Sequence, residues 1–336
     1  MKPLLFAAAL ALPLLGEVKT AEQVYKNITE LKGTPADQLM ATMQFISASL
    51  GVQCETCHVA DNFAADDKRP KKTAREMIAM ELAINKNSFQ GRTQVTCYSC
   101  HRGSERPVAV PPVLETDTPP VIVTRTPGTA GTADAIIEKY VAAIGDMRTI
   151  TSRVGKGVII VVGKETPVEV FTKAPNKRIT ITGGTSSTAF DGTIGWMGTT
   201  GKPAREMTPS EAMGSALDSE FYLGLRLKEM FTQLRPGRPD KIGDIEVTTL
   251  TGTRQGQPPV RLFFDANTGL LLRMVRYTEN PLGRMPVQID YADYRAVDGV
   301  KTPFRWTLSR PNGRFTIQLN EVKANVAIED SKFAKP

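Results

Sequence analysis

Apolar residues follow three patterns along the chain, and each pattern predicts a different kind of structure. Residues 1–16 form a nearly unbroken apolar run after one basic residue. Apolar residues then recur at helical spacing up to about residue 87. From residue 132 onward, short β-branched runs alternate with turn residues, which is typical of antiparallel strands. The chain therefore divides into a helical N-terminal part and a mainly β C-terminal part.

Helix start signals mark the N-terminal part. Thr34-Pro35 places a hydroxyl cap before a proline in the first turn, and Gly51 is a natural stop. Thr73 with Glu76 three residues later forms a capping box. The predicted helices span residues 20–31, 34–50 and 73–87.

The C-terminal part predicts a curved antiparallel sheet around a few helices. Helices are expected at Ala133–Ile144 and Ser210–Leu234. Strands are expected at Val158–Val162, Val168–Thr172 and Arg178–Thr182. Turn signals after residues 266, 297 and 311 divide residues 260–326 into an antiparallel meander. The fold class is therefore α+β, with helical and half-barrel parts.

Length and proline content predict how these parts are divided. A chain of 336 residues is long enough for two domains, each with its own core. Residues 106–131 are rich in proline and predict a semi-rigid linker. The helical domain is expected at residues 20–105 and the sheet domain at residues 132–336.

The net charge of the chain bears on whether nucleic acid is a partner. The formal net charge is +7, spread along the sequence without a block of five like charges. This mild excess does not indicate nucleic-acid binding, which needs a concentrated basic patch.

All four cysteines and both histidines fall within residues 38–102. They form Cys54-Glu55-Thr56-Cys57-His58 and Cys97-Tyr98-Ser99-Cys100-His101. Cys-x-x-Cys-His is the attachment signature of c-type haem, in which the thiols become thioethers and the histidine binds iron. The pattern predicts two covalent haem c groups, with His58 and His101 as iron ligands.

Two other chemistries use similar cysteine pairs. A redox dithiol or a four-thiolate zinc site would use the cysteines. Neither explains a histidine directly after each pair, with no cysteine or histidine left over. Two haems account for all six residues.

The sixth iron ligand must come from another residue type, because both histidines are already used. Methionine is the remaining soft ligand, and each predicted helix ahead of a motif carries two of them. These pairs are Met40 with Met43 and Met77 with Met80, each one helical turn apart. Spacing alone leaves the choice within each pair open. An open iron that binds a peroxide or a gas is the alternative to methionine ligation.

Residues 1–16 read as an export signal, because the apolar run is too short to span a bilayer. Cleavage is expected after residue 16 or as late as residue 21. Covalent haem is attached outside the cytoplasm in bacteria. The signal and the motifs therefore both predict the periplasm, with membrane association left open.

The haem segments resemble a known family. Residues 43–58, MQFISASLGVQCETCH, resemble a haem segment of the cytochrome c subunit of photosynthetic reaction centres. Residues 75–80, REMIAM, and 95–103, VTCYSCHRG, resemble a neighbouring one. The resemblance covers roughly residues 20–112. It implies that Met43 serves the haem on Cys54 and Cys57, and that Met77 serves the haem on Cys97 and Cys100; Met40 and Met80 are then the less favoured candidates.

This chain also departs from the family. Members attached to reaction centres hold four haems and a distal histidine, and some carry a lipid-anchoring cysteine. This chain has two haem motifs, no spare histidine and a large extra domain. The resemblance therefore implies haem ligation more directly than service to a photosystem.

The C-terminal part is similar to the outer-membrane lipoprotein carrier fold. The similarity rests on Phe190-Asp191-Gly192 with Trp196, and on Phe264-Asp265 with Thr268-Gly269-Leu270. This part has no histidine, cysteine or phosphate-binding glycine loop. An apolar cavity for a lipid or quinone-like ligand is the function that such a fold would allow.

The sequence as a whole predicts an electron carrier, not an enzyme. Its expected partners are redox proteins, with a membrane-bound electron-transfer complex as one candidate. One alternative is a haem enzyme or sensor with one open iron. Another is a lipid- or lipoprotein-binding protein in which the haems are adjuncts.

Overall fold

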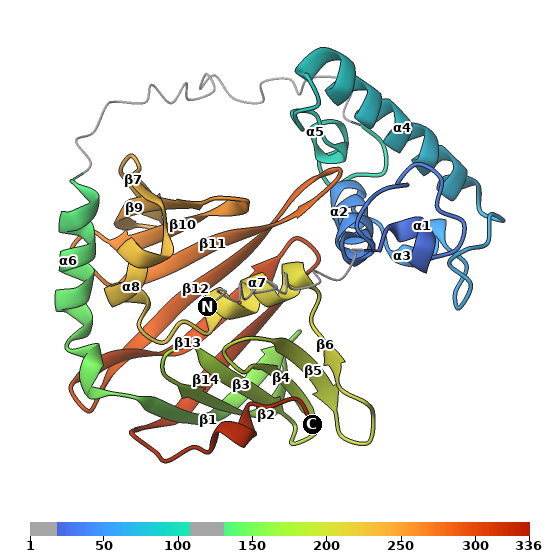
Figure 1. Cartoon of the computed structure of the whole chain (residues 1–336). Coiled ribbons are helices and arrows are strands. Elements are labelled where there is room, and N and C mark those ends of the chain that lie inside the picture. The colour runs from blue at the N-terminus through green and yellow to red at the C-terminus, as the bar shows by residue number, and fades with distance from the viewer. Residues whose placement is uncertain (1–18, 108–130) are drawn as a thin grey trace, which may run out of the picture.

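The computed structural model describes residues 19–107 and 131–336 (Figure 1). The predicted export signal and residues 108–130 of the predicted linker lie outside the described residues. Within the two described ranges, no helix is long and apolar enough to cross a membrane.

The N-terminal region is helical, as predicted. Its elements are α1 (Ala21–Val24), η1 (Ala36–Gln38), α2 (Leu39–Leu50), α3 (Cys54–Cys57), α4 (Arg69–Phe89) and α5 (Cys97–His101). α2 ends at Gly51 in the left-handed conformation, which confirms the predicted stop. The ends of α2 and α5 lie together, because the Gly103 amide donates to the Ser49 carbonyl at 2.8 Å.

Two helix predictions in this region were wrong in extent. The helix predicted over residues 20–31 stops at Val24, because the chain folds back and the Ala21 amide bonds to the Thr34 carbonyl at 2.7 Å. α4 begins at Arg69 instead of Thr73. Pro70 is compatible with the first turn, because N–H groups there have no acceptor within the helix and proline lacks one. Buried Lys71 anchors that turn through bonds to backbone carbonyls.

The C-terminal region is one large antiparallel sheet, which confirms the expected fold class. Its spatial order is β6-β5-β4-β3-β2-β1-β14-β13-β12-β11-β10-β9-β7, and β8 pairs with β9. The β1–β14 pairing joins the first strands of the region to the last. The bounds are β1 (Ser152–Val161), β2 (Lys164–Lys173), β3 (Lys177–Thr182), β4 (Ser186–Phe190), β5 (Gly195–Thr199), β6 (Arg205–Glu206), β7 (Gln233–Pro236), β8 (Asp240–Ile242), β9 (Ile245–Arg254), β10 (Gln257–Asp265), β11 (Leu271–Asn280), β12 (Gly283–Val297), β13 (Val300–Arg310) and β14 (Gly313–Ala324).

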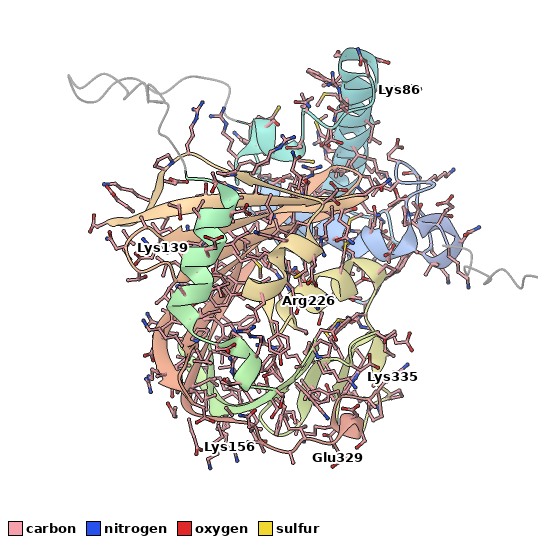
Figure 2. All side chains as sticks on the ribbon, turned by 60° about the vertical axis from the view of Figure 1, so that its left-hand side comes forward. Lys86, Lys139, Lys156, Arg226, Glu329 and Lys335 are labelled. Carbon is pink, nitrogen blue, oxygen red and sulfur yellow. The ribbon has the colours of Figure 1, made fainter. Side chains whose placement is uncertain are left out.

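Three helices pack against this sheet and form its main core. They are α6 (Ala133–Ile144), α7 (Pro209–Asp218) and α8 (Leu223–Met230); short 3₁₀ turns lie at Met147–Thr149 and Asp330–Lys332. Buried residues of α6, α7 and α8 meet those of β9 to β13 in one cluster. On the outside of α6, Lys139 donates to the Ala266 carbonyl at 2.6 Å (Figure 2). α6 has the predicted bounds.

The prediction of a single helix over residues 210–234 is wrong, because these residues form α7, α8 and the start of β7. The break after Asp218 has a physical cause. The Phe221 amide donates to the Pro175 carbonyl at 2.9 Å, and Arg178 donates to the Asp218 carbonyl at 3.2 Å. The backbone at the break therefore bonds to the β2–β3 turn instead of continuing a helix.

The hairpin between β11 and β12 connects the two regions (Figure 1). Leu282 is fully buried and Met285 nearly so, in a cluster with residues of the helical region. The other buried members are Ala21, Leu31, Leu39, Phe45 and Ile78. The sheet therefore supplies part of the core of the helices, and the division into domains at residues 20–105 and 132–336 stays a prediction.

A substitution at Gly283 tests the contact between the β11–β12 hairpin and Phe45. Its φ is +153°, and a Cβ there would lie 2.7 Å from Phe45 Cζ. We expect Gly283→Ala to lower the free energy of unfolding by about 1–3 kcal/mol, because the ring of Phe45 must move. Denaturant unfolding of the full chain measures the loss. Gly313→Ala is the matched control, since a Cβ there meets nothing within 4 Å. Equal effects of the two variants would contradict the proposed fit.

Candidate haem attachment sites

The first motif forms a one-turn helix, α3, with Cys54 at its start and Cys57 at its end. Cys54 is exposed and Cys57 is half-buried, and neither is in a disulfide. His58 leaves the helix in an extended conformation. Its Nδ1 lies 2.9 Å from the backbone carbonyl oxygen of Phe63.

The second motif repeats this arrangement on α5. Thr96 caps the helix and forms a capping box with Ser99. Cys97 is half-buried and Cys100 is exposed, and both are free thiols. The Nδ1 of His101 lies 3.0 Å from the carbonyl oxygen of Ser104.

Both histidines are therefore oriented in the same way. A carbonyl oxygen can only accept a hydrogen bond, so the Nδ1 of each ring carries the proton. The lone pair is then on Nε2, which makes that atom the available metal ligand. Metal-binding histidines are typically held by such a bond from the other ring nitrogen.

The four candidate methionines lie on the helices that precede the motifs. Met43 on α2 is half-buried against the cluster of the helical region, whereas Met40 is 61% exposed. On α4, Met77 and Met80 are 39% and 47% exposed. The assignment of Met43 and Met77 as iron ligands remains a prediction from the family resemblance.

Large exposed hydrophobic side chains are enriched in the helical region that carries the two motifs. Seven of the eleven large exposed hydrophobic side chains lie within residues 19–107, which are less than a third of the described residues. They are Val24, Tyr25, Met40, Phe63, Met77, Met80 and Tyr98. A porphyrin is largely apolar, so Phe63 beside the ring of His58 and Tyr98 within the second motif fit the group that the motifs imply.

Glu81 on α4 is a site residue that the sequence analysis missed. It is only 4% exposed, and its Oε2 accepts a hydrogen bond from the Cys97 thiol at 2.9 Å. Burial raises the pKa of the Glu81 carboxyl, and the bond from Cys97 opposes this only in part. Its other oxygen, Oε1, is buried without a partner. Glu81 is three residues from Ile78 and four from Asn85, and this shared buried face was the available signal.

Asn85 is the second residue that was missed. Its Oδ1 accepts from the Gln94 and Val95 amides at 3.0 Å each, and its Nδ2 donates to the Val95 carbonyl at 2.7 Å. These three bonds hold the backbone just before the second motif. The helix was predicted to end by residue 87, whereas α4 continues to Phe89.

Cys57 and Cys97 differ from the activated thiol of a redox dithiol. Burial, followed by the influence of Glu81, raises the pKa of the Cys97 thiol. Burial also raises the pKa of Cys57. Reactive dithiols instead have one thiol with a lowered pKa.

Within residues 19–107 and 131–336, no group of three or more histidine, cysteine, aspartate or glutamate residues could hold a metal ion.

Comparison with known proteins agrees with this geometry. Residues 10–124 match the family described as photosynthetic reaction centre cytochrome C subunit. The N-terminal region is therefore similar to c-type cytochromes, a class that implies covalently bound haem c and electron transfer.

The individual relatives match the same region. The photosynthetic reaction center cytochrome c subunit of Thermochromatium tepidum is 34% identical over 91 residues, which are 26% of this chain and 22% of that protein. Cytochrome c-554 of Chloroflexus aurantiacus is 34% identical over 85 residues, which are 23% of this chain and 20% of that protein. The chain thus spans about a fifth of the length of these relatives.

Solved structures match the C-terminal region. A DUF1329 family protein from Desulfovibrio piger has 12% identity and a TM-score of 0.44, covering 60% of this chain and 96% of its own. A LolA superfamily protein from Nitrosomonas europaea has 15% identity and a TM-score of 0.42, covering 61% and 99%. These matches concern the fold alone.

The methionine assignment predicts a spectroscopic difference within each pair. We expect Met43→Ala and Met77→Ala each to convert one haem to high spin and lower its reduction potential, because a soft axial ligand is lost. Met40→Ala and Met80→Ala are the matched controls and should leave both haems low spin. Optical spectra of the purified holoprotein decide this. A high-spin haem in a control variant, with none in its partner, would move the assignment to Met40 or Met80.

The Asn85 clamp predicts a loss of stability. Asn85→Ala should lower the free energy of unfolding by about 1–3 kcal/mol, because the bonds to Gln94 and Val95 disappear and their polar groups stay partly buried. Asn87→Ala is the control, since Asn87 is exposed on the same helix. Thermal unfolding of the two variants measures the difference. Matching melting temperatures would show that Asn85 does not hold the second motif.

Proposed function

We propose that this protein is a periplasmic dihaem c-type cytochrome that transfers single electrons. The observation that carries the proposal is the matched geometry of the two motifs. In each, a one-turn helix presents two free thiols, and the histidine Nδ1 is bound to a carbonyl so that Nε2 is available. The similarity of residues 10–124 to reaction-centre cytochromes supports the same chemistry.

The residues have distinct roles in this proposal. Cys54 and Cys57 would hold one haem, and His58 and Met43 would bind its iron. Cys97 and Cys100 would hold the other, and His101 and Met77 would bind its iron. Haem iron supplies the one-electron chemistry, and a histidine–methionine pair raises its reduction potential relative to two histidines.

The protein itself sets orientation and access. The bonds from His58 to Phe63 and from His101 to Ser104 fix the plane of each imidazole. An iron bound by both a histidine and a methionine would have no free position for a small ligand. Electron transfer between proteins is then the remaining activity.

The partners follow from the same residues. We propose exported redox proteins as partners, with a membrane-bound electron-transfer complex as one candidate. Service to a photosystem has less support, because this chain covers only about a fifth of its reaction-centre relative. Nucleic acid is not a proposed partner.

The C-terminal sheet supports the haem region mechanically. Its β11–β12 hairpin completes the core of the helices, and α6, α7 and α8 cover its main core. A hollow of about 390 Å³ lies between Val154, Phe171 and residues 326–332. The Lys332 Nζ lies 4.6 Å from the centroid of the Phe171 ring, and the hollow is lined by one cationic and one anionic side chain, Lys332 and Glu329. An apolar ligand in this region remains a prediction.

A redox titration with carbon monoxide tests the proposal. The full-length holoprotein should show two reversible one-electron steps, and carbon monoxide should not shift the spectrum of the reduced form. A carbon-monoxide shift would mean an open iron, and would favour a haem enzyme or sensor. Absence of any reversible haem step would contradict electron transfer.

A further inference from the structure

Lys71 is a buried cation in the first full turn of α4. It is only 8% exposed. Its Nζ donates to three successive backbone carbonyls, of Phe63 at 2.9 Å, Ala64 at 3.0 Å and Ala65 at 2.7 Å. These residues belong to the loop that follows the first haem motif. Lys71 therefore fixes this loop from a neighbouring helix.

One of these carbonyls also accepts the hydrogen bond of the first histidine. The Phe63 oxygen lies 2.9 Å from His58 Nδ1 and 2.9 Å from Lys71 Nζ. A single oxygen thus connects the imidazole to an ammonium group. The second motif differs, because within the described part of the chain no lysine or arginine donates to the Ser104 carbonyl that faces His101.

Burying an ammonium group is unfavourable unless it is fully hydrogen-bonded, and Lys71 meets this condition through three carbonyls. Its position on the helix still has a cost. A cation in the first turn of a helix opposes the helix dipole, and α4 has no acidic residue there to compensate. The loop needs only N–H donors for its carbonyls, and an uncharged side chain could supply them. The positive charge of Lys71 is therefore not needed to order the loop, but it does act on the nearby imidazole of His58.

Two electrostatic effects of Lys71 act in the same direction. A positive charge near the haem stabilises the reduced iron, which carries one positive charge fewer than the oxidised iron. Lys71 also competes for the Phe63 oxygen, which weakens that oxygen's pull on the His58 proton. His58 then donates less electron density to iron, and this again favours the reduced state.

Other charged groups in this cluster adjust the effect. Asp66 pairs with Lys71 at 3.1 Å and with Arg75 at 3.0 Å. These partners, Arg75 first, hold the pKa of Asp66 well below its usual range. The cluster of Asp66, Lys71 and Arg75 thus keeps a net positive charge next to the first motif.

We propose that Lys71 is a positioning residue that raises the reduction potential of the haem on Cys54 and Cys57. The inference rests on the proposed dihaem function and deepens it by making the two haems inequivalent. Among residues 19–107 and 131–336, no lysine or arginine donates to the carbonyl that faces the histidine of the other haem motif. An electron shared between the two haems is thereby drawn toward the first.

The test replaces Lys71 by a neutral donor. Lys71→Gln keeps an N–H for the loop carbonyls but removes the charge. We expect the reduction equilibrium constant of the first haem to fall about tenfold, which is about 59 mV for one electron. The second haem should keep its midpoint. Spectroelectrochemical titration of the full-length holoprotein measures both midpoints, and Met77→Ala assigns the second haem.

Two further variants make the result specific. Lys72→Gln is the matched control, because Lys72 is exposed, adjacent and equally charged; it should shift neither midpoint appreciably. Asp66→Asn removes the counter-charge and should raise the midpoint of the first haem. If Lys71→Gln does not fold, this upward shift carries the test alone.

The outcomes separate this inference from the proposed function. Wild-type protein without two haem midpoints would overturn the dihaem proposal itself. Two normal midpoints, with the first one unchanged in Lys71→Gln or in Asp66→Asn, would overturn only the role of Lys71. An equal shift in Lys71→Gln and Lys72→Gln would also overturn it, because net charge alone would then explain the change.

Discussion

The hydrogen bond between each histidine Nδ1 and a backbone carbonyl is the interaction on which the rest of the structure depends. It decides which ring nitrogen can bind iron and fixes the plane of the imidazole. These carbonyls belong to the segments that follow the two motifs. Lys71 and Asn27 tie down the first loop, because both donate to the Ala64 carbonyl.

α4 connects the two sites. Its buried face carries Lys71, Ile78, Glu81 and Asn85 in order along the helix. The first of these bonds to the loop of the first motif, Glu81 accepts from the free Cys97 thiol, and Asn85 holds the backbone before the second motif. The helical region has few buried apolar residues of its own and uses Leu282 and Met285 from the sheet. The hairpin of the sheet therefore adds buried apolar surface to the helical region.

Much of this arrangement could be predicted from the sequence. The attachment motifs, the α6 bounds and the antiparallel meander depend on local patterns, and local patterns are visible in one sequence. The start of α4 at Arg69, the break at Asp218 and the role of Glu81 depend on contacts between distant segments. No sequence pattern around Glu81 predicts its contact with Cys97. Tertiary contacts also overrode a strong local signal, since the capping box at Thr73 lies inside α4.

The central claim is that each cysteine pair is bound to a haem. Intact mass spectrometry of the mature protein, combined with alkylation of free thiols, tests it most directly. The account predicts a mass increased by two haems and four cysteines that do not react. A mass without added tetrapyrrole, with four thiols that alkylate freely, would contradict it.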